Sequence, residues 1–288
     1  MHARAARMPL YAAGLTAILA ATLTACGSVT GGSAAAPTTP LDAVRLAAQT
    51  SSAATSFTGT VSVQATVKAG TAGSGNTSLA ASFTERLRPS LLAQVDIQSM
   101  TAGGTTVPGG MTEILTPGTF YMKWSYLTQL LKTAKPWIAI PLSAMSKSSG
   151  IDFSQMLSQA SSSSPLTESQ MLAGATTVRK VGTGTVGGVA VTEYTGTLSL
   201  AKGLKYLSAS VRSAMQKEMG TAGITHATFT VWIDGKNTVR KAIITEHGTA
   251  LTETVTTTIT SIDQPVNVSI PAASQTTPFP TGDLSNLG

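Results

Sequence analysis

Residues 57–68, FTGTVSVQATVK, alternate between apolar and polar side chains along their whole length. This period of two is typical of a β-strand with one buried face, here formed by Phe57, Val61, Val63, Ala65 and Val67. The next segment, residues 70–77, contains three glycines and an asparagine, which predicts a hairpin. A second strand follows and places Leu79, Ala81 and Phe83 on one face. The sequence therefore predicts an antiparallel sheet with one apolar face.

Similar extended segments recur along the chain, separated by turn signals such as Gly187-Gly188 and Asp234-Gly235. The further predicted strands are residues 91–98, 111–115, 119–123, 138–141, 176–186, 189–200, 227–234, 238–247 and 251–262. Helical spacing or capping residues predict helices at residues 41–55, 127–132, 151–160, 166–172 and 201–219. Long antiparallel strands with few helices predict an α+β domain built on one curved sheet.

The N-terminus has the organisation of an export signal. Arg4 and Arg7 precede an apolar run, residues 10–23, that is too short to span a bilayer of ~30 Å. Cys26, the only cysteine, follows directly in Leu-Thr-Ala-Cys. This segment resembles the lipobox of bacterial lipoproteins, and the alternative is a plain signal peptide followed by an accidental cysteine. The resemblance implies a diacylglycerol group on the Cys26 sulfur, cleavage before Cys26 and anchoring at the extracytoplasmic face of the cell membrane.

The chain divides into four predicted parts. Residues 1–25 are the lipoprotein signal peptide, and residues 26–40 are the lipidated Cys26 with a tether of small residues and two prolines that cannot form a core. Residues 41–272 form the folded domain, and residues 273–288 are expected to be a disordered tail. Without another cysteine, no disulfide stabilises this domain outside the cytoplasm.

The composition argues against a nucleic-acid partner. Only 11% of the residues are charged, and loss of Arg4 and Arg7 leaves 17 basic residues against 13 acidic ones. The resulting net charge of +4 is scattered, whereas nucleic-acid binding requires Lys and Arg gathered on one surface.

The motifs for catalysis and cofactors are weak. Residues 182–187 spell G-x-G-x-x-G, but a strand follows instead of the helix that a dinucleotide site needs, so we interpret them as a turn. Ser199 and Lys202 match S-x-x-K without its companion motifs. His226 and His247 have no metal-ligand spacing, so we predict no metal and no cofactor. A Ser–His–acid triad from distant positions stays open, which leaves a secreted hydrolase as one alternative.

Three short stretches resemble a known family. They are residues 120–123 (FYMK), 135–138 (KPWI) and 230–236 (TVWIDGK), and together with the lipobox they resemble actinobacterial lipoproteins related to the LppX/LprG glycolipid carriers. The resemblance implies a fold like that of LolA and LolB, a half-barrel of curved antiparallel sheet whose concave face is covered by helices. It implies an acyl-chain carrier with no catalytic residues, hence not an enzyme. Its cargo would be a di- or triacylated lipid or glycolipid, and its protein partner an envelope transporter.

Alternation and the aromatic residues around positions 120–137 select the candidate cavity residues. Aromatic clusters are often core, and the alternative here is a wall of a ligand cavity. The candidates are Val61, Val63, Phe83, Val95, Ile97, Phe120, Trp124, Trp137 and Trp232. Trp232 alternates against Val231 and Ile233, which makes it the weakest candidate. Small inward residues such as Gly59, Ala65, Ala81 and Ala93 leave room for more than one acyl chain. The alternative to a carrier is a surface lipoprotein that acts as a sensor or binds a protein.

Overall fold

A computed structural model describes residues 37–68, 74–107, 110–144, 171–207 and 209–279. The predicted signal peptide, Cys26, residues 27–36, the helix expected at 151–160 and residues 280–288 lie outside these ranges. The described helices are α2 (Pro40–Ser52), α3 (Ser125–Leu130), α7 (Leu200–Gly203) and α8 (Ala209–Ala222), with short 3-10 turns at Leu172–Gly174, Leu204–Tyr206 and Ala273–Gln275. None of the helices in the described ranges is long and apolar enough to cross a membrane.

A single sheet of 13 strands dominates the described residues. Its order is β13-β7-β6-β5-β3-β2-β1-β12-β11-β10-β9-β8, and β4 pairs with β3 beside this path. Neighbouring strands are antiparallel, except that β13 runs parallel to β7. The strands are β1 (Ser56–Val67), β2 (Gly75–Arg86), β3 (Leu92–Ala102), β4 (Thr105–Val107), β5 (Met111–Leu115), β6 (Thr119–Lys123), β7 (Trp137–Pro141), β8 (Ala175–Val186), β9 (Val189–Leu198), β10 (Ile224–Asp234), β11 (Val239–Gly248), β12 (Leu251–Ile262) and β13 (Thr276–Pro278).

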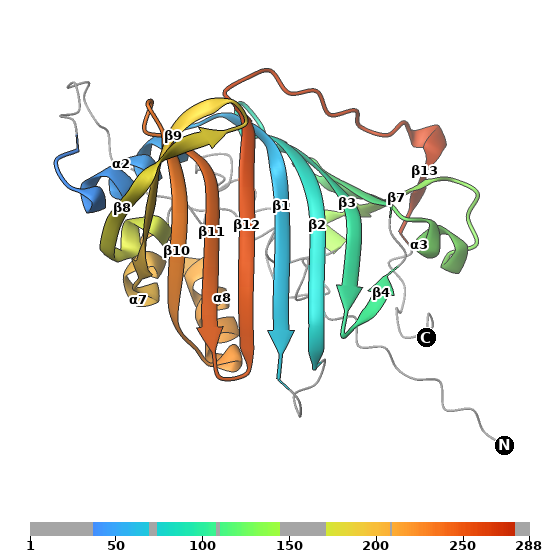
Figure 1. Cartoon of the computed structure of the whole chain (residues 1–288). Coiled ribbons are helices and arrows are strands. Elements are labelled where there is room, and N and C mark those ends of the chain that lie inside the picture. Colours follow the sequence, from blue (N-terminus) through green and yellow to red (C-terminus); the bar gives the residue numbers. More distant parts are fainter. Residues whose placement is uncertain (1–36, 69–73, 108–109, 145–170, 208, 280–288) are drawn as a thin grey trace.

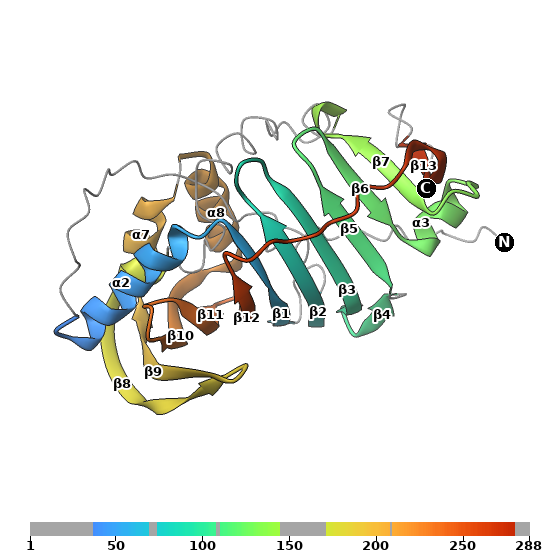
Figure 2. The ribbon, with the colours of Figure 1, turned by 90° about the horizontal axis from the view of Figure 1, so that it is seen from above.

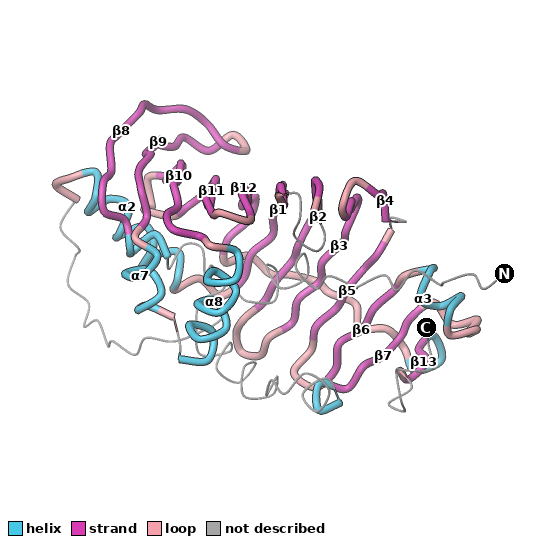
Figure 3. Tube along the Cα trace, turned by 90° about the horizontal axis from the view of Figure 1, so that it is seen from below, coloured by secondary structure: helices cyan, strands magenta, loops and turns pink. Residues whose placement is uncertain are grey.

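The sheet is strongly curved and does not close, so it forms a half-barrel. Its strands stand side by side from β10 to β3 (Figure 1), and the view from above shows the curve, with α2, α7 and α8 inside it over β8–β11 (Figure 2). Figure 3 shows the same trough from below, with α3 at the opposite end of the sheet from these helices. The predicted α+β half-barrel is confirmed.

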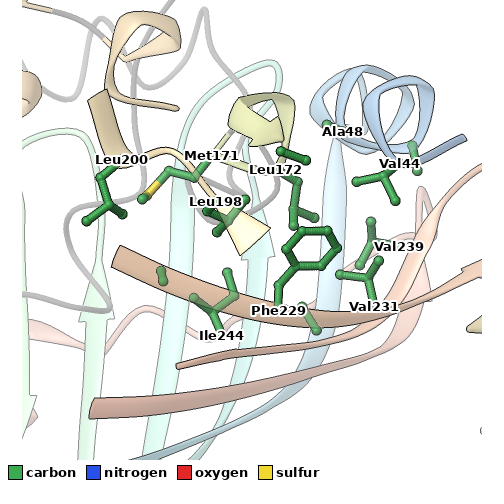
Figure 4. Packing of buried hydrophobic residues seen from close by; sticks show 14 of the residues in the cluster. Val44, Ala48, Met171, Leu172, Leu198, Leu200, Phe229, Val231, Val239 and Ile244 are labelled. Carbon is green, nitrogen blue, oxygen red and sulfur yellow. The ribbon is translucent and has the colours of Figure 1, made fainter. Parts of the chain in front are cut away.

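The helix-covered half of the sheet has the largest core. Helix α2 begins where Pro40 and Asp42 predicted it, because the Thr39 hydroxyl accepts a hydrogen bond from the Asp42 backbone N–H at 3.1 Å. Its Val44 and Ala48 pack toward Phe229 of β10, together with neighbouring strands and turns (Figure 4). This packing fixes which face of β10 and β11 is inside the trough.

The helix expected at residues 201–219 is two helices. Helix α7 ends at Gly203, the turn Leu204–Tyr206 follows, and the extended Leu207 is buried at 2% exposure. The Arg212 guanidinium donates hydrogen bonds back to the carbonyl oxygens of Leu204 at 3.0 Å and Leu207 at 2.9 Å. It thereby satisfies carbonyl groups that the break in the helix leaves without helical partners.

The ordered part of the domain extends beyond the expected boundary at residue 272. Thr276–Pro278 forms β13 on the edge strand β7, and the Lys135 ammonium donates to the carbonyl oxygens of Ala273 at 3.3 Å and Thr276 at 2.9 Å. Residues 273–279 therefore belong to the fold. The local sequence could not show this, because the lysine that holds the segment lies far away in the chain.

Candidate functional site

One face of the sheet continues from the helix-covered strands across the other half of the trough. Directly paired residues of antiparallel strands point to the same side. Phe229 pairs with Ile244, Ile244 with Val255, and Val255 with Val63. The inner face of β10 is therefore continuous with the face of β1 that carries Val63.

The same register extends this face to β5. Val61 pairs with Ala81, Ala81 with Ile97, and Ile97 with Met111. We call the resulting surface the concave apolar face, and its members are Val61, Val63, Leu79, Ala81, Phe83, Val95, Ile97, Met111 and Met122.

Several large side chains of this surface are incompletely packed. Val63, Leu79, Val95 and Ile97 are buried, but Val61, Phe83 and Met122 are only half-buried. Half-buried apolar groups near the centre of a wide sheet are suited to contact with an apolar ligand, because burying them further is favourable.

Seven of the nine residues selected from the sequence lie on or beside the concave apolar face. Val61, Val63, Phe83, Val95 and Ile97 are members of it. Phe120 packs at its end, in a cluster with Phe57 and Leu142, and Trp124 follows β6 and contacts the face. The strand period predicted which residues of each strand share a face, the pairing of the strands brings those faces together, and the role of these residues in ligand binding stays a prediction.

Trp137 lies on the convex face and is a correction to the candidate set. Its neighbour Ile138 pairs with Met122 on the concave side, so Trp137 points the other way. It packs there against a cluster that includes Ile114 of β5 and Val268 of the segment after β12. The apolar surroundings of Trp137 come from that C-terminal segment, which the local pattern of β7 does not reveal.

Trp232 also lies on the convex face. Val231 and Ile233 are buried on the inner side of β10, so Trp232 points outward. Its strand neighbour Lys241 places the ammonium group 4.7 Å from the centre of the indole ring, which is a cation–π contact. Trp232 is therefore a surface residue paired with a lysine, and it does not line the trough.

The concave sides of β2 and β5 each carry a carboxyl group that is not among the residues selected from the sequence. Glu113 of β5 pairs with Val95 and Met122, so it shares their face, and it is only 4% exposed. Glu85 of β2 pairs with Phe57 and Ala93 on the same side and is half-buried. The alternation could have placed both residues on the concave side, because they keep the spacing of the apolar positions. A charged residue at such a position is, however, usually assigned to the solvent-exposed face.

Burial raises the pKa of Glu113 and of Glu85 from 4.5 to about 7. Their side chains face apolar neighbours, and a carboxylate in such surroundings loses hydration without gaining a counter-ion. The ion pair between Asp234 and Arg240 is far along the sheet. Near neutral pH the concave apolar face therefore carries carboxyl groups that exchange between neutral and charged forms.

We expect Glu113 to make the protein less stable as the pH rises. The pKa of Glu113 is higher in the folded protein than in the unfolded chain. The contribution of Glu113 to the free energy of unfolding is therefore fully present below pH 4.5 and is lost as the pH rises through about 7. That change corresponds to about 3 kcal/mol of unfolding free energy. Urea unfolding of the wild type and of Glu113→Gln at pH 5 and pH 8 measures this change. The free energy of unfolding should fall less in the variant between the two pH values, because the other carboxyl groups contribute equally to both proteins. Equal losses in both proteins would contradict the assignment.

The described residues hold no group of three or more His, Cys, Asp or Glu side chains placed to bind a metal ion. His226 and His247 stack with ring centres 4.8 Å apart and belong to paired positions of β10 and β11. The feature that β1, β2, β3, β5 and β6 assemble is thus an apolar surface that includes the carboxyl groups of Glu85 and Glu113.

The known proteins to which this chain is similar are solved structures. No protein-family model matches the sequence, and no curated protein matches it. The chain is similar to the crystal structure of the lipoprotein LppX from Mycobacterium tuberculosis, with 19% identity and a TM-score of 0.41, over 80% of this chain and 97% of LppX. It is also similar to LprF from Mycobacterium bovis, with 14% identity and a TM-score of 0.48, over 81% of this chain and 97% of LprF.

These similarities agree with the resemblance to the LppX/LprG family that the sequence motifs indicated.

Proposed function

We propose that this chain is a lipoprotein of the cell envelope that holds the acyl chains of a lipid or glycolipid against its concave apolar face, and transfers or displays that lipid. Cys26 would carry the membrane anchor, and residues 27–40 would be the tether. The observation that carries the proposal is the continuous apolar face across β1, β2, β3, β5 and β6 with its half-buried centre.

The physical chemistry of such a surface favours acyl chains over small polar ligands. Each methylene group removed from water contributes about 0.8 kcal/mol, so a two- or three-chain lipid has a large affinity for an apolar trough. For a lipid taken from a bilayer this gain in free energy is nearly cancelled, because the acyl chains are already out of contact with water in the bilayer. Exchange of lipid with a membrane then requires that the protein is close to the membrane, and it requires no energy source. A tether anchored in the membrane keeps the protein close and so raises its effective concentration there.

The proposal is tested by the lipid that the protein carries. A chain that begins at Gly27, and so lacks a covalent lipid, is purified without detergent, and its organic extract is analysed by mass spectrometry. We expect about one di- or triacylated lipid per protein, and uptake of such a lipid from vesicles once the protein has been stripped. Intact mass of the full-length chain from membranes tests the anchor, with an acylated N-terminal Cys26 as the expected result.

Absence of lipid in the extract together with absence of uptake would overturn the carrier function. A surface lipoprotein that senses a ligand or binds a protein would then be the better interpretation. An unmodified Cys26 in the mature chain would overturn the anchor and leave the lipid-binding face to be judged separately.

A further inference from the structure

Glu113 is a buried polar group with an unmet hydrogen-bonding need. Among the described residues its Oε1 has no hydrogen-bond partner, and the side chain is 4% exposed on the concave side of β5. Val95 of β3 and Met122 of β6 are its directly paired neighbours. Buried polar atoms are nearly always paired in folded proteins, so an unpaired one in a functional surface requires an explanation.

Within the part of the chain that the structure describes, no cation faces Glu113 from the strands around it. Along β1, β2, β3, β5, β6 and β7, the described residues on the concave side include one other ionisable group, Glu85. Arg86, Asp96 and Lys123 occupy the alternate positions of their strands and lie on the convex side. The surroundings therefore favour the neutral carboxylic acid, which carries one O–H donor beside its acceptor oxygen.

We infer that Glu113 is the polar contact of the lipid site, and that its protonated carboxyl group donates a hydrogen bond to a carbonyl oxygen of the ligand. This inference rests on the proposed lipid-binding function and specifies the ligand further. The acceptor is an ester or amide carbonyl, the group that joins acyl chains to the polar part of a lipid. Glu113 then fixes how far along the trough that junction lies.

The energetics favour such an acceptor over plain hydrocarbon. Glu113 has already lost its hydration in the folded protein, so a carbonyl that pairs with it adds a hydrogen bond without a further desolvation cost on the protein side. A ligand that lacks the acceptor leaves the group unpaired, and sites built on a buried polar group discriminate against such ligands. Met122, which is unbranched and half-buried, is the neighbour that can move aside to admit the ligand.

The test compares two phospholipids that have the same headgroup and chain length and the same photoactivatable group near the chain end. One has ester-linked acyl chains and the other has ether-linked alkyl chains. The full-length chain is placed in phosphatidylcholine vesicles that contain either probe, and labelling of peptides from β1–β6 is quantified by mass spectrometry. At about pH 5.5, where the carboxyl is protonated, we expect the wild type to prefer the ester probe about three- to tenfold.

The variants separate the hydrogen bond from the apolar surface. Glu113→Leu should label equally with both probes, whereas Glu113→Gln should keep the ester preference because its amide group also donates. Raising the pH to about 8.5 should abolish the preference in the wild type and leave it in Glu113→Gln. Glu193→Leu is the matched control, since Glu193 pairs with Trp232 on the convex face of the sheet.

The outcomes distinguish this inference from the function on which it rests. Equal labelling by the two probes in the wild type at low pH, or a preference that survives in Glu113→Leu, would overturn the role of Glu113 while lipid binding stands. A preference that grows above pH 7 would also overturn it, because the charged carboxylate would then be the binding form. If neither probe labels the concave strands, the proposed function itself fails, and the inference fails with it.

Discussion

Replacing Gly196 with alanine should lower the free energy of unfolding by about 3 kcal/mol. Gly196 of β9 pairs with Phe229 of β10, and the ring of Phe229 lies over it. A methyl group at this position would collide with the carbonyl oxygen of Thr177 and lie 2.9 Å from two ring carbons of Phe229. Moving either group is energetically costly, because the Thr177 carbonyl belongs to the backbone and Phe229 is a core side chain at 2% exposure.

Gly184→Ala is the matched control, because a methyl group there meets nothing within 4 Å and the residue lies in the adjacent strand β8. Urea unfolding of both variants should show a large loss for Gly196→Ala and little change for Gly184→Ala. Similar stability of the two variants would mean that β9 and β10 are packed differently. Gly59 of β1 has the same relation to Phe83, so each half of the sheet contains a glycine under a phenylalanine ring.

The second large effect concerns bound lipid. Val61→Glu places a charge at a half-buried position of the concave apolar face, between Ala81 of β2 and Thr257 of β12. A carboxylate covered by acyl chains would be unpaired and desolvated, so we expect at least about a tenfold loss of bound lipid. The lipid-to-protein ratio after purification without detergent measures the loss.

Gln64→Glu is the control for Val61→Glu. It adds the same charge to the same strand, but Gln64 is exposed on the other side of the sheet, so bound lipid should stay at the wild-type level. Val61 is a better test position than Ala81, whose 2% exposure means that a larger side chain would disturb the core. Equal lipid content in the two variants would show that the acyl chains do not lie on this face.

Local periodicity predicted most of the strands. The alternation in residues 57–68 predicted which side chains of β1 face inward, and Asp234-Gly235 predicted the turn between β10 and β11. Such signals are strong because a strand with one buried face must repeat every two residues. They also selected Val95, Ile97 and Phe83 for one face, and the pairing of β2 with β3 places Phe83 opposite Val95.

Predictions failed where distant segments decide the environment. Trp137 was predicted to line the cavity, but it lies on the convex side of β7, where it packs against the cluster that contains Val268. The helix expected at residues 201–219 is interrupted at the extended Leu207, and Arg212 bonds back to the carbonyl groups that this break leaves. In both cases the deciding contact is tertiary or involves a side chain whose direction the local pattern does not specify.

The sequence by itself determined the α+β class and the strand faces, because each depends on residues close together in the chain, and the lipobox resemblance at Cys26 stays a prediction. Only the tertiary structure decided that the apolar faces of β1–β6 join across one continuous trough, since that depends on strand order and register. It also decided the chemistry of Glu113. A glutamate in a short strand is ordinarily solvated, and this one is buried because the register of β3 and β6 places the apolar side chains of Val95 and Met122 beside it.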